Sequence, residues 1–412
     1  MGSLLKKNIY GALAQLLSFI GLLVNNLIIP KLLGFEVFGR VSAMLSLPYF
    51  AQGLVESALF AYVVQLSRFP NTRGAHLRAL FNIIGVYFSF IGVAMAVYAL
   101  AAGIALEHFI LMTAITVMMG LYTLLLSINL GNAHGSAIVR NSLLFSLSLS
   151  LLPLLFCSML GTGARGILWS VFTTYAICAA GLWRDARATI EEILTAKMRI
   201  GGTRVRRMAQ KVALLCGPRL LFVTFNTLAI LVFSLFARSQ QVALYKLVLS
   251  AGIAVIYSVP LHPSIFQATL WNSQSASKTI FLWLASIWIL VGAVVLYALL
   301  PMILKYIFKG QVLEMGYLRV IPLLTPLLYL VWLTPNLLIG RVSVRTIFYV
   351  SLASVGLFLG VSLLAPFKLA SDHGLVLAMV VSLCSYAILM GIKVYMVGRN
   401  SGSNYRSARA VS

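Results

Sequence analysis

Among the few charged residues deep inside long apolar runs, where an uncompensated charge is costly, two are candidates for a functional role. Glu56, in GLVESALFAYVV, is the only carboxylate in the middle of such a run, and Arg219 follows Gly217-Pro218 about two turns into another. A charge at the centre of a membrane-spanning helix costs about 2.5–3.5 kcal/mol on insertion scales. We therefore expect Glu56 to act in coupling, as a proton site or a cation's partner, and Arg219 to bind an anionic ligand. The alternatives are a hydrogen bond between helices for Glu56 and an Arg219 that reaches back to the inner membrane surface.

Three further polar residues belong to the same apolar regions. Lys246 and Arg319 lie near the ends of two runs. They are candidates for the same anionic ligand, and the alternative is that their long side chains extend to the outer membrane surface. His262 lies between two prolines. We assign it to coupling, and a packed polar residue is the alternative.

Amide side chains are concentrated in the first two apolar runs. Gln15, Asn25 and Asn26 lie in the first run, and Gln52 lies in the second. Amides in membrane helices either hold helices together by hydrogen bonds or bind a ligand. Because four of them lie in neighbouring runs, we assign them to binding a hydroxylated substrate.

The composition places these residues in a helical membrane protein. Hydrophobic residues make up 61% of the 412 residues, charged residues make up 9%, and the mean hydropathy is +0.99. Since a membrane-spanning helix needs about 20 apolar residues, the pattern predicts an all-α protein with twelve transmembrane helices in two lobes of six. The predicted parts are an N-terminal lobe (1–183), a linker (184–211), a C-terminal lobe (212–398) and a basic tail (399–412).

The polar linker between the lobes fixes the predicted orientation. It is rich in arginine and lysine, and the remaining basic residues lie mostly in loops on the same predicted side. Because cytoplasmic loops carry the excess of Lys and Arg, we expect both termini and the linker to be cytoplasmic. Ile190, Ile193 and Leu194 fall at helical spacing among charges, which predicts either an amphipathic helix along the inner leaflet or a solvated tether.

Several classes of function are disfavoured by the same features. The formal net charge of +23 is spread over short loops, so we expect no nucleic-acid partner. Cys157, Cys178, Cys216 and Cys384 lie in four different runs without C-x-x-C spacing, and histidines are not clustered. We therefore expect no disulfide, no metal site and no cofactor.

Three segments resemble a known family. The run NNLIIPKLLGFEVFGRVSAMLSL, which includes an L-G-x-x-x-[FY]-G loop, is similar to the opening of the bacterial polysaccharide-unit flippases (Wzx type) of the MATE-like exporter superfamily. GTGARGILWS and YIFKGQVLEMGYLRVIPLL resemble further loose signatures of that family. The resemblance extends over nearly the whole chain and rests on pattern and topology.

The resemblance implies a function as well as a fold. It implies two six-helix lobes around a cationic cavity in the bacterial inner membrane, and export of an undecaprenyl-pyrophosphate-linked oligosaccharide for O-antigen, capsule or another glycan. Membrane lipids and other polysaccharide assembly proteins are the implied partners. An arginine suits such a cargo because its planar guanidinium can hold a diphosphate with two hydrogen bonds.

Other functions are compatible with a chain of twelve spans. A multidrug or cation antiporter of the same fold would need more acidic residues in mid-span than Glu56 alone. A membrane-embedded polysaccharide polymerase or ligase would carry a long outer loop with catalytic Arg and His, whereas the predicted outer loops are short, so we expect a carrier and not an enzyme. A major-facilitator carrier normally has an aspartate in its 2–3 loop, which RFPNTRGAHLR lacks.

The predicted topology is tested by the accessibility of introduced cysteines. Cysteine in place of Ser273 should be labelled from the cytoplasm, and cysteine in place of Ser371 from outside, because an odd number of spans separates the two loops. Labelling of both positions from one side by a membrane-impermeant maleimide would refute the twelve-span topology.

Overall fold

The computed structural model describes residues 2–66, 73–131, 135–161, 163–195, 201–259, 276–308, 316–338, 342–364 and 371–409. The first half contains α1 (Gly2–Leu66), α2 (Arg73–Ala101), α3 (Leu106–Gly131), α4 (Gly135–Leu160) and α5 (Ala164–Thr195). The second half contains α6 (Gly202–Val223), the π-helix η2 (Thr224–Leu228), α7 (Ala229–Ser234), α8 (Ser239–Ser258), α10 (Ala276–Ile307), the 3-10 helix η3 (Gly316–Leu324), α11 (Thr325–Leu338), α12 (Val344–Leu364) and α13 (Ser371–Arg409). Within these ranges the predicted all-α fold is confirmed.

The helices expose apolar side chains in the way that membrane helices do. Within the described ranges, ten segments are long and apolar enough to cross a membrane. In α2, for example, Phe90 is 71% exposed and Leu100 is 85% exposed. Such surfaces are unfavourable in water and suit contact with lipid chains. The chain is therefore a multi-pass membrane protein.

Helix α1 consists of two arms that meet at Gly34. This glycine has φ 79° and ψ 163°, a conformation that L side chains rarely adopt, and it breaks the helical path of the 65 residues. Each arm has about half of that length, or about 48 Å at 1.5 Å per residue, against a hydrocarbon thickness of about 30 Å. The two arms are the first two predicted spans, and with the ten segments above they account for the predicted twelve.

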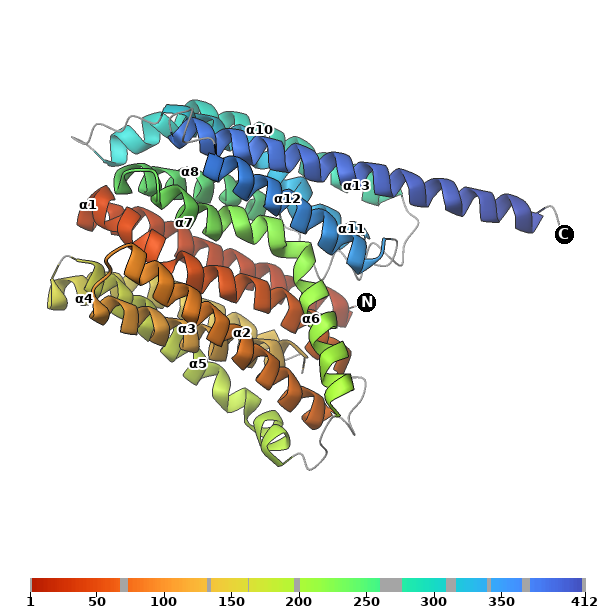
Figure 1. Ribbon diagram of the computed structural model, residues 1–412, viewed down its shortest axis with the longest axis horizontal. Helices are drawn as coiled ribbons and strands as arrows, with labels where there is room; N and C mark the ends of the chain where they lie inside the picture. Colours follow the sequence, from red (N-terminus) through yellow and green to blue (C-terminus); the bar gives the residue numbers. More distant parts are fainter. Residues whose placement is uncertain are drawn as a thin grey trace.

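The chain termini lie at one end of the bundle. Figure 1 shows the start of α1, the last turns of α13, the end of α5 and the start of α6 at this end, and the turn between the two arms of α1 at the opposite end. That turn is at Gly34. We call these two ends the terminal end and the Gly34 end. Helix α5 continues into the polar linker as far as Thr195, and α13 continues without a break past residue 398 to Arg409. Within the linker Ile193 is buried and Leu194 is 73% exposed.

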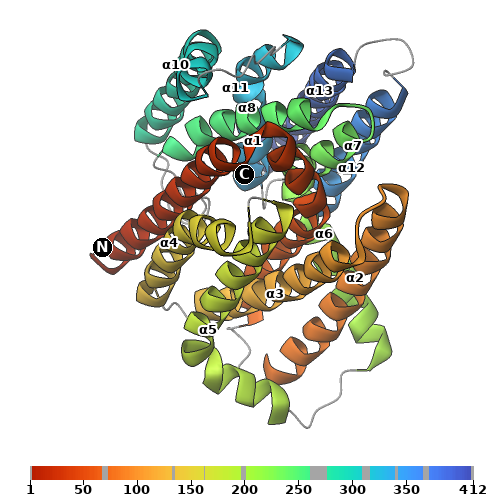
Figure 2. The same ribbon diagram turned by 90° about the vertical axis from the view of Figure 1, so that its left-hand side faces the viewer.

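Helix α1 is the element that both halves of the structure share. Figure 2 shows it between α2–α5 on one side and α8 and α10–α13 on the other. It packs on α3 and α4 in the first half and on α6 and α8 in the second. The Ser146 hydroxyl on α4, for instance, donates to the carbonyl of Leu17 at 2.7 Å. Helix α1 therefore makes most of the contact between the two halves, with a smaller contribution from α2 against α6.

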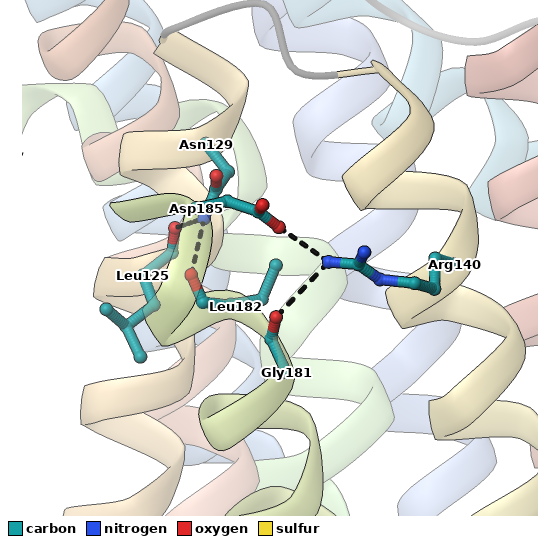
Figure 3. A network of polar contacts seen from close by, with 6 residues as sticks. All are labelled: Leu125, Asn129, Arg140, Gly181, Leu182 and Asp185. Carbon is teal, nitrogen blue, oxygen red and sulfur yellow. Dashed lines mark hydrogen bonds and ion pairs between the residues drawn. The ribbon is translucent and has the colours of Figure 1, made fainter. Parts of the chain in front are cut away.

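Polar contacts at the terminal end join α3, α4 and α5. The Arg140 guanidinium on α4 donates to the Asp185 carboxylate at 2.6 Å and to the Gly181 carbonyl at 3.4 Å (Figure 3). The Asn129 amide on α3 donates to the Leu182 carbonyl at 3.2 Å. These bonds hold the first half together where the helices leave the apolar layer.

Two glycines in the second arm of α1 allow close approach to the second half. A Cβ atom at Gly39 would overlap the carbonyl oxygen of Ser239 at the start of α8. A Cβ atom at Gly53 would lie 3.0 Å from both γ-carbons of Val223 on α6. Small residues permit this kind of backbone approach between membrane helices, so the second arm lies directly against both α8 and α6.

The contact at Gly39 predicts a stability difference between two glycines. Gly39→Ala should lower the melting temperature of the purified protein by several degrees, because α1 and α8 would have to separate at the Gly34 end. Gly85→Ala on α2 is the matched control, since a Cβ there meets nothing within 4 Å and alanine is the better helix former by about 1 kcal/mol. Equal melting temperatures for the two variants would contradict the close approach.

Candidate functional site

The register of α1 against α6 brings the two mid-span charges to the same depth. The second arm of α1 and α6 run antiparallel, since Gly53 contacts Val223 and, nearer the terminal end, the Lys211 ammonium lies 5.6 Å from the centre of the Tyr62 ring. Glu56 lies three residues after Gly53, and Arg219 lies four residues before Val223. Both are therefore one turn from the Gly53 contact, on the side of the terminal end.

Glu56 and Arg219 attract each other without direct contact. The charge of Arg219 acts on Glu56, and both act on the Tyr257 hydroxyl near the end of α8. Among the described residues, however, the two side chains are not an ion pair within 4.0 Å. The structure thus brings together the carboxylate and the guanidinium that the sequence singled out, and a third group, Tyr257, that it did not.

Tyrosines of the first half face Glu56 from the other side. Tyr122 on α3 and Tyr175 on α5 both interact electrostatically with Glu56. The Tyr175 hydroxyl donates to Gln52 Oε1 at 2.8 Å, and the Asn141 amide donates to the Tyr122 hydroxyl at 3.3 Å. Gln52 therefore orients a tyrosine in this structure, while its predicted role in binding substrate stays a prediction.

A second cation lies nearer the Gly34 end. The Lys246 ammonium on α8 donates to Asn226 Oδ1 at 3.3 Å, and both side chains are partly buried. Asn226 belongs to the π-helix η2, whose wider turn interrupts the regular hydrogen-bond ladder. The Tyr245 hydroxyl donates to the carbonyl of Phe225 at 2.8 Å, which secures this turn against α8.

An amide contact lies between the two cations in depth. The Asn26 amide on the first arm of α1 donates to the Ser250 hydroxyl of α8 at 3.0 Å. Ser250 follows Lys246 by four residues and precedes Tyr257 by seven, so all three share one face of α8. Asn25 is buried beside it, and its Oδ1 accepts no hydrogen bond within the described part of the chain.

Of the three remaining predicted residues, the structure describes the side chain of Arg319 alone, and it does not bring Arg319 to this interface. Arg319 on η3 is exposed, and its guanidinium lies 4.9 Å from the centre of the Tyr297 ring on α10. The side chain of Gln15 and the whole of His262 lie outside the described residues. Their predicted roles, in substrate binding for Arg319 and Gln15 and in coupling for His262, stay predictions.

Some of the site residues that the sequence analysis did not single out could have been recognised from the sequence, and others could not. Asn226 is a lone amide in an apolar run. Asn25 and Asn26 were singled out because they are amides in an apolar run, and the same criterion also selects Asn226. Tyr122, Tyr175 and Tyr257 have no distinctive spacing. Their shared proximity to Glu56 depends on helices that are distant in sequence.

The assembled interface is suited to binding an anion. It combines two cations, one carboxylate and a set of amides and hydroxyls at the contact between the halves. No group of three metal-ligating side chains occurs in the part of the chain that the structure describes. A guanidinium held near a carboxylate, but not in contact with it, has donors left for a phosphate group.

Comparisons with known proteins find similar structures but no similar sequence. No family model matches the chain, and no curated protein matches it. Among solved structures, the lipid II flippase MurJ in an inward closed conformation has a TM-score of 0.67 at 14% identity, covering 94% of this chain and 87% of that one. An inward-facing multidrug resistance transporter of the MATE family has a TM-score of 0.64 at 12% identity, covering 93% and 96%.

A third similar structure broadens the range of functions on this fold. A transporter of the MOP superfamily from Pyrococcus furiosus has a TM-score of 0.56 at 11% identity, covering 95% of this chain and 96% of that one. Identities this low establish shared architecture and not shared substrates. The chain therefore has the fold found in MATE and other MOP-superfamily transporters and in the MurJ flippase, as the sequence predicted.

Proposed function

We propose that this protein is a flippase that moves an undecaprenyl-pyrophosphate-linked oligosaccharide from the cytoplasmic to the periplasmic leaflet of the bacterial inner membrane. The observation that carries the proposal is Arg219, a guanidinium in mid-span at the contact between the halves. Glu56 acts on it electrostatically, but among the described residues Arg219 takes part in no ion pair. A lipid-linked diphosphate supplies the charge that such a residue needs. The lipid tail stays in the bilayer while the sugar crosses between the halves.

The orientation and the division of the chain belong to the same proposal. With both termini cytoplasmic, the terminal end faces inward and the Gly34 end faces outward. Residues 1–183 and 212–398 form the two lobes, which rock against each other around α1, and residues 184–211 and 399–412 lie at the cytoplasmic surface. Proteins that assemble or polymerise the sugar units are the proposed partners.

Glu56 acts in this mechanism as the internal substitute for the cargo. When the site is empty, its carboxylate partly compensates the charge of Arg219 and so lowers the cost of a lone charge. When the diphosphate binds, it takes over the guanidinium and Glu56 is released. Export of a group of about −2 charge across 100 mV, negative inside, releases roughly 4–5 kcal/mol at about 2.3 kcal/mol per charge. The membrane potential is therefore sufficient to drive the loaded step, and Glu56 biases the return.

A multidrug or cation antiporter is the second candidate. The observation that favours it is the enclosure of Glu56 by Tyr122, Tyr175 and Tyr257 together with Arg219. A single carboxylate surrounded by hydroxyls is suited to exchanging a proton. Against it stands the excess of cations at the interface, which repels a cationic drug. The two candidates differ in their response to substitutions at the two central charges.

Arg219 should be required for binding a prenyl diphosphate. Arg219→Ala should weaken binding of farnesyl diphosphate to the purified protein by about tenfold or more, because a hydrogen-bonded charge pair is lost. Arg219→Lys should restore part of the affinity, since it keeps the charge but not the planar fork. Arg207→Ala, at the exposed start of α6, is the matched control. Titration calorimetry gives the affinities, and wild-type affinity in Arg219→Ala would refute the site.

Glu56 should modulate the rate of transport and its dependence on pH, but its ionisation should not be required for transport. Glu56→Gln should keep appreciable flipping in proteoliposomes, bind farnesyl diphosphate more tightly, and lose dependence on external pH, because the competing carboxylate is gone. Glu56→Asp should retain that dependence. The groups facing this position are Arg219 from α6, Tyr257 from α8, Tyr122 from α3 and Tyr175 from α5. A stably inserted but inactive Glu56→Gln would make proton exchange obligatory and favour the antiporter.

A further inference from the structure

Lys246 is a second, partly buried cation that the binding of cargo at Arg219 does not use. Among the described residues its recorded partner is a neutral amide, Asn226, and it takes part in none of the ion pairs. Asn226 is seven residues from Arg219 along α6 and η2, which is two turns and about 10 Å. The two cations are therefore anchored at different levels of the interface, two helical turns apart.

The local backbone geometry holds a polar partner beside the Lys246 ammonium. The π-helix η2 shifts the register of this segment by one residue relative to an α-helix, and Asn226 lies inside it. The carbonyl of Phe225 is bonded to the Tyr245 hydroxyl, and Tyr245 is fully buried. The bond from Tyr245 holds the π-helical turn on α8, and in this position Asn226 Oδ1 accepts a hydrogen bond from the Lys246 ammonium. A lysine that merely extended toward the membrane surface would need no such partner.

The contact between Asn26 and Ser250 separates the two cations. Ser250 is one turn from Lys246 on the face of α8 that also carries Tyr257, and Tyr257 lies at the depth of Arg219. The bond joins α1 to α8, and the two helices also meet closely at Gly39. The bond between Asn26 and Ser250 therefore lies between the levels of the two cations, on the face of α8 that carries both Lys246 and Tyr257.

We infer that Lys246 and Asn226 form a second diphosphate-binding position, which receives the cargo from Arg219 once the bond between Asn26 and Ser250 has opened. This inference rests on the proposed function and adds an order of events to it. The diphosphate binds first at Arg219, with Glu56 displaced. It then moves about two helical turns toward the Gly34 end and is held by the ammonium, with the Asn226 amide NH₂ as an additional donor, until release.

Binding and transport should respond differently to changes at the two cations. In the purified full-length protein, Lys246→Gln should bind farnesyl diphosphate within about twofold of the wild type, whereas Arg219→Gln should lose about tenfold or more. In proteoliposomes, flipping of undecaprenyl diphosphate carrying one N-acetylglucosamine, detected with an added lectin, should fall about tenfold or more for both variants. Lys246→Arg should restore flipping.

A second variant tests the position without removing the lysine. Asn226→Asp places a carboxylate beside the ammonium, so it should fill the position with an internal anion. It should reduce flipping about as much as Lys246→Gln does, and Asn226→Gln is the uncharged control. A Lys246→Gln protein that flips at the wild-type rate, or an Asn226→Asp protein that does so, overturns the second position.

The gate is tested by a cross-link. Cysteines in place of Asn26 and Ser250, in a chain whose four native cysteines are serine, should when cross-linked abolish flipping and leave binding of farnesyl diphosphate dependent on Arg219. Reduction should restore flipping. Continued flipping by the cross-linked protein overturns the gate.

The results also separate this inference from the proposed function. If the wild type fails to bind farnesyl diphosphate, or if Arg219→Gln leaves that binding unchanged, the proposed function fails, and the second position fails with it. If Arg219→Gln loses binding and Lys246→Gln loses the same affinity, the two cations form one site. In that case only the second position is refuted.

Discussion

An ionised side chain in the hydrocarbon layer needs an opposite charge or a polar partner, and this requirement governs the centre of the structure. Arg219 and Glu56 satisfy it from two different halves of the protein, α6 and α1. Because they attract each other without ion-pair contact, neither charge is fully neutralised. Such a pair stabilises the empty interface, and its remaining hydrogen-bonding capacity is available to a ligand. In the proposed mechanism, the contact between the halves and the binding of the diphosphate therefore depend on the same two side chains.

The helix backbones bring these charges together through the smallest residues of α1. At Gly53 and Gly39 a single additional carbon would press against α6 or overlap α8. The first contact sets the register that aligns Glu56 with Arg219. The second holds α1 to α8 at the Gly34 end. Without hydrophobic contrast between protein and lipid, close packing of this kind contributes much of the attraction between helices.

The polar residues at the interface form a series of hydrogen-bonding or charged groups at successive depths between the two ends of the bundle. Tyr257 and the central charges lie at one depth, Asn26 and Ser250 at the next, and Lys246 and Asn226 nearest the Gly34 end. In the proposed mechanism, an anion that moves along this series meets a hydrogen-bond donor at each level. Proteins of this fold include a multidrug transporter and a lipid II flippase, so the architecture alone does not determine what is carried.

Hydropathy and the cost of burying charge were enough to predict the all-helical membrane fold and to single out Glu56, Arg219 and Lys246. Both are properties of a short stretch of sequence, since twenty apolar residues span a membrane and a charge among them is rare in any context. Which charges meet was decided by tertiary structure. Gln52 contacts a tyrosine 123 residues away, and Asn26 contacts a serine 224 residues away. Helix register and the π-turn at Asn226 depend on packing between segments that are distant in sequence. The local sequence does not determine that packing.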